Sequence, residues 1–410
     1  MKTSRRRFLQ ASLTAASLRA PRARAQTAGS TYDVAVIGAG VFGAWTAWYL
    51  TKQGKRVALV DAHGPGNSRS SSGGETRVTR MGYGKDELYT RWSLRSLGEW
   101  KALAARTGGA PLFHATGVLW MAREQDPLTL ATQETLARVA VPHQKLDRRE
   151  LEARWPQIDF GPVRWAIHEP ESGALMARRS VQAVVSEAVA SGVDLVRGKV
   201  EPPKLSGRLA AIRLGSGASL SAGSFVFACG PWLPKVFPEV LDGRIFPTRQ
   251  EVFYFGPPPG EARFAPPAMP TWIDFGDEIY GIPDIESKGM KIAPDKHGPA
   301  FDPDSGERVV TREGLRAVRA FVARRFPALK GAPLVASEVC QYENTSNGDF
   351  LIDRHPESDD VWMVGGGSGH GFKHGPAVGS AVAQAILGGA KPDPRFNLAT
   401  KARVQKRSVY

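Results

Sequence analysis

The chain has 410 residues, of which 42% are hydrophobic and 23% are charged. These proportions predict one large domain or two closely packed ones, and they exclude disordered, collagen-like and low-complexity architectures. Lys and Arg exceed Asp and Glu by 54 to 40, but seven of the bases lie in residues 1–25, which contain no acid. The remaining net charge of +7 (14 − 7) includes no basic block with interleaved aromatic residues, so nucleic-acid binding is not expected.

The first 25 residues have the composition of an export signal. The run Ser4–Leu9 (SRRRFL) is followed by a weakly apolar stretch to Leu18 and by Ala23–Ala25. This segment resembles a twin-arginine signal with an Ala-x-Ala cleavage site, although a basic tail of a cytoplasmic protein is the alternative. The signal predicts export of the folded protein by the twin-arginine machinery to the periplasm or the exterior. No other segment is apolar over the roughly 18 residues that a membrane span requires.

A nucleotide-binding pattern begins at the buried-strand sequence Tyr32–Ile37. It continues with the GxGxxG turn of Gly38, Gly40 and Gly43, and then with a helical stretch to Leu50. The glycines let the backbone approach a pyrophosphate, whose charge is favoured at a helix N-terminus. A second strand, 56–60, ends in Asp61, 21 residues after Gly40, where an acid can accept a hydrogen bond from a ribose. The alternative is that the glycines serve only a turn.

After Asp61 the chain leaves the repeating strand and helix pattern that a nicotinamide dehydrogenase would continue, which favours FAD over NAD. A polar loop, 63–74, leads to Glu75–Arg80, which brings two arginines near the nucleotide pocket. The later elements are expected, in chain order, to be a helix at 86–106, a helix at 177–190, a strand at 194–200, a strand at 224–228, β-type stretches at 249–255 and 271–282, a strand at 361–364 and a helix at 377–387.

Six stretches carry a resemblance to a known family: Gly38–Gly43, Gly74–Arg80, Ala228–Trp232, Val339–Tyr342, Asp349–Asp353 and Gly369–Lys373. In this order and spacing, the chain resembles the flavin-dependent amine oxidases of the D-amino-acid oxidase superfamily. It is most similar to the monomeric sarcosine oxidase group, which includes N-methyltryptophan and pipecolate oxidases. The resemblance implies an α/β fold with a Rossmann-type FAD-binding domain (31–112, 171–243 and 333–391) and a β-rich substrate domain (113–170 and 244–332). Residues 397–410 are expected to form a solvated basic tail.

The resemblance implies FAD as cofactor, attached covalently by a thioether from Cys340. A buried inert cysteine or a disulfide with Cys229 are the alternatives for Cys340. Backbone N–H groups of the loop 365–371 are expected to face the flavin pyrimidine edge. No metal site is expected. The predicted cofactor-binding residues are Gly38, Gly40, Gly43, Asp61, Thr76, Arg77, Val200, Cys340, Gly369, His370, Gly371, Phe372 and Lys373.

The resemblance also assigns substrate-side roles. Arg80 and Lys373 match positions that hold a substrate carboxylate, and Tyr280 and Tyr342 match tyrosines of the pocket. Lys291 matches the lysine that supports oxygen reduction, and Arg77 matches an arginine against the flavin face.

Two positions depart from the family pattern, because Gly73 and Asp295 stand where histidines are expected. Gly73 is expected to make room in the pocket. Asp295 is expected either to meet a cationic or hydroxylated substrate or to pair at the surface with a base such as Lys296. Sarcosine itself is therefore in doubt as the substrate.

The implied activity is oxidation of the C–N bond of a secondary amino acid, N-methylated or cyclic. The amine binds neutral, a hydride equivalent passes to flavin N5, and oxygen is then reduced to hydrogen peroxide beside Lys291. A monomer is expected. The alternatives are a periplasmic dehydrogenase of the same fold with a quinone or cytochrome acceptor, and a non-catalytic flavoprotein. A nicotinamide enzyme would leave Cys340 and Gly369–Lys373 without a purpose.

Overall fold

The first sheet combines strands from three distant stretches of residues 32–405, the part of the chain that the computed structural model describes. Its seven strands are, in spatial order, β17 (Leu351–His355), β18 (Ser358–Gly365), β11 (Ser219–Phe227), β1 (Tyr32–Ile37), β2 (Val57–Asp61) and β9 (Asp194–Arg197), with β10 (Ala211–Arg213) paired to β11. The five strands from β18 to β9 are parallel, and β17 and β10 run antiparallel to their neighbours. The Rossmann-type α/β architecture expected from the sequence is therefore present.

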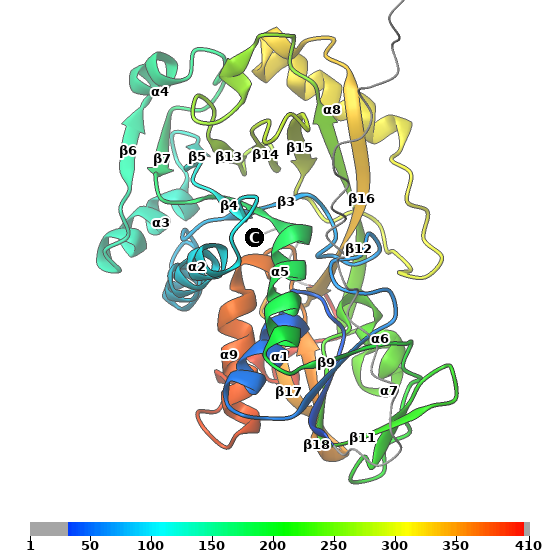
Figure 1. Ribbon diagram of the computed structural model, residues 1–410. Coiled ribbons are helices and arrows are strands. Elements are labelled where there is room, and N and C mark those ends of the chain that lie inside the picture. Colours follow the sequence, from blue (N-terminus) through cyan, green and yellow to red (C-terminus); the bar gives the residue numbers. More distant parts are fainter. Residues whose placement is uncertain (1–31, 406–410) are drawn as a thin grey trace, which may run out of the picture. The chain divides into compact units, whose positions relative to one another are not determined.

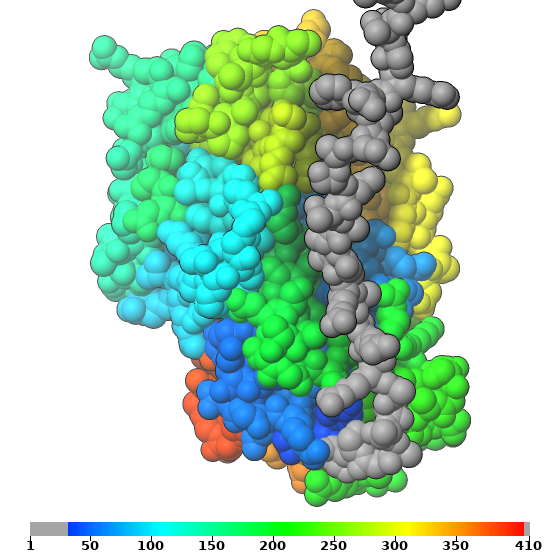
Figure 2. Space-filling view, viewed as in Figure 1, coloured from blue at the N-terminus to red at the C-terminus, as the bar shows by residue number. Residues whose placement is uncertain are grey.

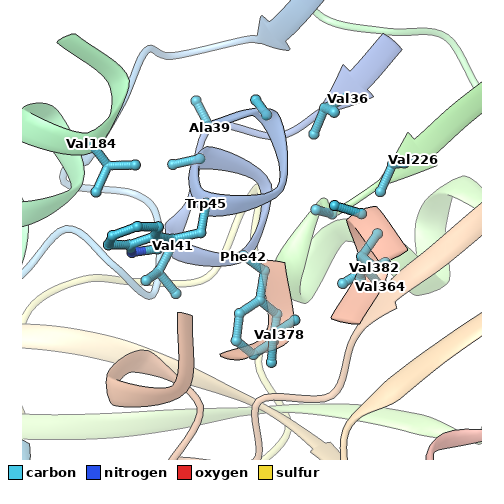
Figure 3. Close-up of a cluster of buried hydrophobic side chains, with 14 of the residues drawn as sticks. Val36, Ala39, Val41, Phe42, Trp45, Val184, Val226, Val364, Val378 and Val382 are labelled. Atoms are coloured by element: carbon cyan, nitrogen blue, oxygen red, sulfur yellow. The ribbon is translucent and has the colours of Figure 1, made fainter. Parts of the chain in front are cut away.

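Helices cover one face of this sheet (Figure 1). They are α1 (Val41–Lys52), α2 (Glu87–Thr107), α5 (Ala177–Ala190) and α9 (Gly375–Ile386). Figure 3 shows how Trp45 of α1, Val184 of α5 and Val378 of α9 gather over the sheet residues Val226 and Val364. Removing these apolar side chains from water supplies much of the driving force that fixes the helices on the sheet.

The opposite face of the first sheet carries a separate apolar cluster. Here α6 (Leu233–Val236) and α7 (Pro238–Leu241) bring Leu233, Phe237 and Leu241 against Phe225 and Phe227 of β11. Phe227 and Phe237 meet edge to face, with ring centroids 4.8 Å apart. Because both faces of β11 are covered, its last three residues, Phe225–Phe227, are continuously buried, as their apolar sequence predicts.

The second sheet has eight strands and forms the upper part of Figure 1. In spatial order they are β16 (Leu334–Thr345), β12 (Ile245–Phe255), β15 (Met290–Pro294), β14 (Ile279–Ile282), β13 (Thr271–Asp274), β5 (Val118–Ala122), β7 (Trp165–Glu169) and β6 (Gln144–Asp147). The stretch 271–282 is thus two strands joined by a turn. The accompanying helices are α3 (Pro127–Arg138), α4 (Arg148–Arg154) and α8 (Arg312–Arg325), and Phe321 of α8 stacks on Trp272 at 5.8 Å.

A third, small sheet joins the two larger ones. It consists of β3 (Thr76–Thr79), β8 (Gly173–Met176) and β4 (Phe113–His114). Figure 2 shows cyan and green segments side by side on one face of the molecule. Strand β8 itself is buried, and it pairs with β4 through Phe113 with Leu175 and His114 with Ala174. Strand β3 carries Arg77 and leads directly to Arg80, so this sheet sets the position of both arginines.

The prediction of a solvated basic tail is wrong at Lys401, whereas Arg403 is exposed as predicted. The side chain of Lys401 is fully buried, and its Nζ donates to the carbonyl of Arg395 at 2.8 Å. Arg403 donates to the carbonyl of Asp242 at 2.9 Å. The segment packs because backbone carbonyls replace water around these charges. Residues 406–410 lie outside the described residues.

The described residues form one compact unit, so the two-domain division and its boundaries stay a prediction. No helix among residues 32–405 has the length and apolar character needed to cross a membrane. The predicted export signal at 1–25 lies outside the described residues and stays a prediction that cell fractionation would test.

The packing of α1 on α9 generates a test. A Cβ at Gly379 of α9 would lie 2.6 Å from the backbone carbonyl carbon of Trp45, so Gly379→Ala should lower the free energy of unfolding by about 2 kcal/mol or more. The matched control is Gly98→Ala in α2, where no atom lies within 4 Å of an added Cβ. That change should raise the free energy of unfolding by up to about 1 kcal/mol. Equal effects in denaturant titrations would contradict this account.

Candidate active site

A large cavity, of about 570 Å³, lies where the parallel strands of the first sheet end. Its wall includes the residues that follow β1, β2 and β11, together with part of β16. In open α/β sheets this edge is where nucleotides bind. The predicted cofactor residues in the wall are Gly38, Gly40, Asp61, Arg77, Val200, Cys340, Gly369, Gly371 and Phe372.

The three glycines of the turn have different roles. Gly38 has φ +104°, and a Cβ there would lie 2.3 Å from the carbonyl oxygen of Ala228. A Cβ at Gly43 would lie 1.9 Å from the carbonyl oxygen of Gly38, so both positions exclude side chains. At Gly40 the nearest atom to an added Cβ is Ser72 Oγ at 3.6 Å. The second glycine therefore leaves open space beside the N-terminus of α1, where an anion can approach.

Asp61 closes this end of the cavity. Its Oδ2 accepts the N–H of Ala39 at 2.8 Å, and its Oδ1 accepts the N–H groups of His63 and Gly64 at 2.7 and 2.6 Å. A carboxylate has about four lone-pair positions, so it can still accept a ribose hydroxyl. Val200, beyond the end of β9, forms a single β-bridge with Leu214 and completes the wall.

Cys340 lies on β16 beside the guanidinium of Arg77. The Arg77 Nη2 to Cys340 Sγ distance is 3.5 Å, and Arg77 also donates to the carbonyls of Thr76 and Ser71. Cys229 is a separate free thiol whose pKa burial raises, so the disulfide alternative for Cys340 is wrong.

A second, smaller chamber of about 70 Å³ adjoins the large cavity. The two share Arg77, Tyr342, Gly369 and Phe372 in their walls. The chamber also contains most of the residues predicted on the substrate side. Its other lining residues are Val78, Arg80, Ile273, Phe275, Tyr280, Asp295, His297, Ser368, His370 and Lys373.

Two buried cations form one side of the chamber. Arg80 and Lys373 are 6% and 3% exposed, and Lys373 Nζ donates to the carbonyl of His370 at 2.9 Å. Burial, and then the charge of Arg80, lowers the pKa of Lys373 well below its usual value. An anion bound between the two would stabilise the charged lysine. The structure thus brings together the two residues predicted to hold a carboxylate.

Asp295 and two tyrosines provide the polar groups elsewhere in the chamber. Tyr342 Oη donates to Asp295 Oδ1 at 3.2 Å. Burial raises the pKa of the Tyr280 and Tyr342 hydroxyls above their usual range, so both stay protonated. Asp295 lines the chamber, whereas Lys296 is exposed. The structure therefore supports the pocket interpretation of Asp295 over surface pairing with Lys296.

Four residues singled out from the sequence lie outside both cavity walls: Gly43, Gly73, Thr76 and Lys291. Lys291 Nζ donates to the carbonyl of Thr76 at 3.0 Å and lies 5.5 Å from the ring centroid of Tyr280. Burial, and then the charge of Arg77, lowers the pKa of Lys291 to about 7. Gly73 does not make room in the chamber, because it packs in a turn where a Cβ would lie 1.9 Å from the carbonyl oxygen of Asn67.

Glu343 was not singled out from the sequence. It lies on β16 in the wall of the large cavity and is 8% exposed. Its Oε1 accepts the N–H of Gly367 at 3.3 Å, and its Oε2 is buried without a hydrogen-bond partner. Burial raises the pKa of Glu343 to about 7. An acid within a strand gives no sign in the sequence of which way it points, so only the structure places it here.

These observations fit a dinucleotide in the large cavity. The first turn of α1 contains no acidic residue that would repel a pyrophosphate, and Gly40 leaves room for one. The unpartnered oxygen of Glu343 offers a further polar contact along the cavity wall. The smaller chamber adjoins the wall of the large cavity. A ring system of the dinucleotide at this shared wall would therefore face a carboxylate bound in the chamber.

Comparisons with known proteins identify a family for the chain. A family model described as FAD dependent oxidoreductase matches residues 33–385. Monomeric sarcosine oxidase from Streptomyces avermitilis is 32% identical over 375 residues, covering 89% of this chain and 96% of that protein. N-methyl-L-tryptophan oxidase from Yersinia pestis is 26% identical over 367 residues, covering 88% and 96%. The solved structure of L-proline dehydrogenase from P. horikoshii has a TM-score of 0.76 at 23% identity, covering 90% and 97%.

The buried carboxyl of Glu343 makes stability depend on pH. Because folding raises its pKa from 4.5 to about 7, the folded state keeps a proton that the unfolded state loses over this range. The free energy of unfolding therefore falls as pH rises from about 4.5 to 7. In the flavin-free protein, Glu343→Gln should remove this loss, a gain at pH 8 relative to pH 4.5 on the order of 3 kcal/mol.

Denaturant titrations at the two pH values measure this effect. The control is Glu124→Gln at an exposed position, which should leave the difference between the two pH values as in the wild type. Parallel pH dependence in wild type and Glu343→Gln would contradict the assignment.

Proposed function

The chain belongs to the family of FAD dependent oxidoreductases, as its sequence motifs predicted, and we propose that it oxidises the C–N bond of a secondary amino acid with oxygen as electron acceptor. One observation carries the proposal: the chamber that adjoins the nucleotide cavity contains two buried cations, Arg80 and Lys373. Such a pair suits a carboxylate, because a guanidinium and an ammonium both gain when a desolvated anion lies between them. The bound FAD would supply the acceptor of the substrate hydride and pass the electrons on.

The chamber chemistry supports an amino acid over a simple carboxylic acid. Arg80 and Lys373 would hold the carboxylate, and the bound anion would stabilise the ammonium of Lys373. Asp295, fixed by the hydroxyl of Tyr342, would accept a hydrogen bond from the substrate N–H. The names of the two curated relatives supply the N-methyl preference, since sarcosine is N-methylglycine.

The size of the chamber favours a small substrate. About 70 Å³ is available, and Val78, Ile273 and Phe275 line it with apolar atoms. Removing a small aliphatic group from water against these side chains is favourable, whereas a large polar side chain would lack partners. A compact N-methyl or cyclic amino acid is therefore the proposed substrate class.

Oxygen is the proposed electron acceptor because of Lys291. Its ammonium lies close enough to Arg77 and Cys340 for their charges to affect its pKa, which places it near the region where a ring attached at Cys340 would lie. A buried cation stabilises the negative charge that develops when oxygen takes an electron. A dehydrogenase with another acceptor would not need this charge.

We also propose that FAD is attached covalently through Cys340. Support comes from the position of Sγ in the wall of the large cavity and from the Arg77 guanidinium 3.5 Å away. When the thioether forms, the 8α methyl group would lose a proton, the sulfur would bond to that carbon, and the flavin ring would take up the two electrons as it is reduced. The neighbouring guanidinium would favour the sulfur as the nucleophile. Cys229 also lines the cavity, but burial raises its pKa, which makes it the weaker nucleophile.

The two buried lysines allow the two halves of the reaction to be tested separately. Lys373→Met should weaken substrate binding about tenfold or more, measured as enzyme reduction on anaerobic mixing with a secondary amino acid. Lys291→Met should leave that step close to wild type and slow reoxidation by oxygen about 100-fold. Both changes remove one buried ammonium, so each serves as the control for the other.

Three outcomes would contradict parts of the proposal. Equal effects of both variants on one half-reaction would reject the division of roles. Slow reoxidation of the wild type by oxygen with rapid reduction of a dye would point to a dehydrogenase. Failure of a broad panel of secondary amines to reduce the wild type would point to a non-catalytic flavoprotein.

Acid denaturation tests the covalent link. Wild-type protein precipitated in acid should keep its yellow absorbance, and Cys340→Ala should release it, because the thioether survives unfolding whereas noncovalent contacts do not. Cys229→Ala is the matched control and should keep the absorbance. Release of flavin from the wild type would show that attachment at Cys340 is wrong.

A further inference from the structure

The guanidinium of Arg80 lies over two aromatic rings. Its Cζ is 4.4 Å from the ring centroid of Tyr83 and 4.8 Å from that of Trp120, and Nη1 donates to the carbonyl of Gly82. A ring face attracts a cation without neutralising it, so the positive charge stays available to attract an anion. The two rings thus stabilise the position of Arg80 while preserving its charge.

Tyr83 contacts the second cation of the chamber as well. Lys373 Nζ lies 5.0 Å from the centroid of the Tyr83 ring. One buried ring, 3% exposed, is therefore shared by both residues that are proposed to hold the carboxylate. Two like charges in a desolvated chamber repel each other, and a common aromatic neighbour offsets part of that repulsion.

The Tyr83 hydroxyl is held by two histidines. It lies 2.8 Å from His374 Nε2 and 3.2 Å from His370 Nδ1. His370 Nε2 lies 3.0 Å from the carbonyl of Gly348, which only accepts, so Nε2 of His370 carries a proton. In the neutral ring Nδ1 then accepts from Tyr83, and the Tyr83 oxygen is left to accept from His374.

The state of His374 agrees with this direction of hydrogen bonding. Burial, and then the charges of Lys373 and Arg80, lowers the pKa of His374 well below its usual value. The imidazole is therefore neutral and donates through Nε2, while its Nδ1 is buried without a partner. The hydroxyl of Tyr83 is fixed by one donor and one acceptor, and this fixes the ring beside the cations.

Trp120 is held in a comparable way. Its Nε1 donates to Glu169 Oε1 at 2.7 Å. The same carboxylate accepts the backbone N–H groups of Met81 and Gly82 at 2.8 and 3.0 Å. Glu169 therefore ties the second ring to the backbone that immediately follows Arg80.

We propose that Tyr83 is a positioning residue of the substrate site, whose ring holds Arg80 and Lys373 in the arrangement that binds a carboxylate. The inference rests on the proposed function, because it assumes that this pair binds the substrate. It adds a residue that does not itself need to touch the substrate. Substitution of Tyr83 should therefore weaken binding of the carboxylate more than it slows turnover.

The test measures carboxylate binding by the flavin-loaded enzyme. Acetate is titrated while the flavin absorption spectrum is recorded, and acetamide serves as the neutral probe of the same shape. Tyr83→Leu should raise the acetate Kd about tenfold and should raise KM for the amino acid more than it changes kcat. Tyr83→Phe keeps the ring but loses the histidine contacts, so its acetate Kd should rise about two- to threefold.

The control for loss of a tyrosine is Tyr49→Leu. Tyr49 packs on Trp45 and Trp48 in α1 and lines neither cavity, so this variant should bind acetate as the wild type does. An acetate Kd in Tyr83→Leu equal to that of the control would overturn the inference. If Tyr83→Leu does not fold, Tyr83→Phe decides, and an unchanged Kd there would also overturn it.

Arg80→Met separates failure of this inference from failure of the proposed function. If acetate leaves the wild-type spectrum unchanged, or if Arg80→Met binds acetate as tightly as the wild type, the carboxylate site itself is rejected. If Arg80→Met weakens acetate binding but Tyr83→Leu does not, only the role of Tyr83 is rejected. Acetamide binding that changes in parallel with acetate would indicate a distorted chamber and would reject positioning of the charges.

Discussion

Contact between backbones at glycine fixes the geometry on which the rest of the site depends. Gly38 faces the carbonyl of Ala228, Gly43 faces Gly38, and Gly379 faces Trp45. Because a methyl group fits at none of these contacts, β1, β11, α1 and α9 cannot shift relative to one another without losing them. The N-terminus of α1 and the loop between β18 and α9 therefore keep fixed positions on either side of the nucleotide cavity, and the chamber beside that loop inherits them.

The parts of the structure that the sequence predicts are those set by short-range pattern. The strand at 32–37, the glycine turn and the acid at Asp61 are adjacent in sequence, and a helix at 177–190 follows from its own apolar spacing. The resemblance extends this to Arg80 and Lys373, which are far apart in sequence but meet in the chamber. The prediction that these two residues share a site came from the order of the motifs along the chain, because no local sequence pattern links them.

The residues that sequence reasoning missed or misplaced depend on contacts between distant segments. Gly73 packs into a local turn, which a glycine in a polar loop does not by itself predict. Lys401 is buried by residues that precede it, although a charged side chain near the end of the chain is expected to be exposed. Burial in the assembled fold raises the pKa of Glu343, and the backbone N–H groups of Gly367 and Gly366 in the loop after β18 offset only part of this effect. Tyr83 meets a histidine 291 positions later. The burial and the orientation of a single polar side chain are set by the assembled fold. They could therefore not be predicted from the sequence.

Tyr342 belongs to the walls of both cavities, whereas Ile273, Phe275 and Asp295 line the chamber alone. A substitution at Tyr342 therefore changes the walls of the cofactor cavity and of the substrate chamber together. Substitutions at the other three residues leave the cofactor cavity intact. Ile273 and Phe275 lie on β13 and in the turn after it, and Asp295 directly follows β15. Engineering at these three positions can therefore alter substrate range without touching the cofactor cavity, whereas a change at Tyr342 on β16 alters both properties at once.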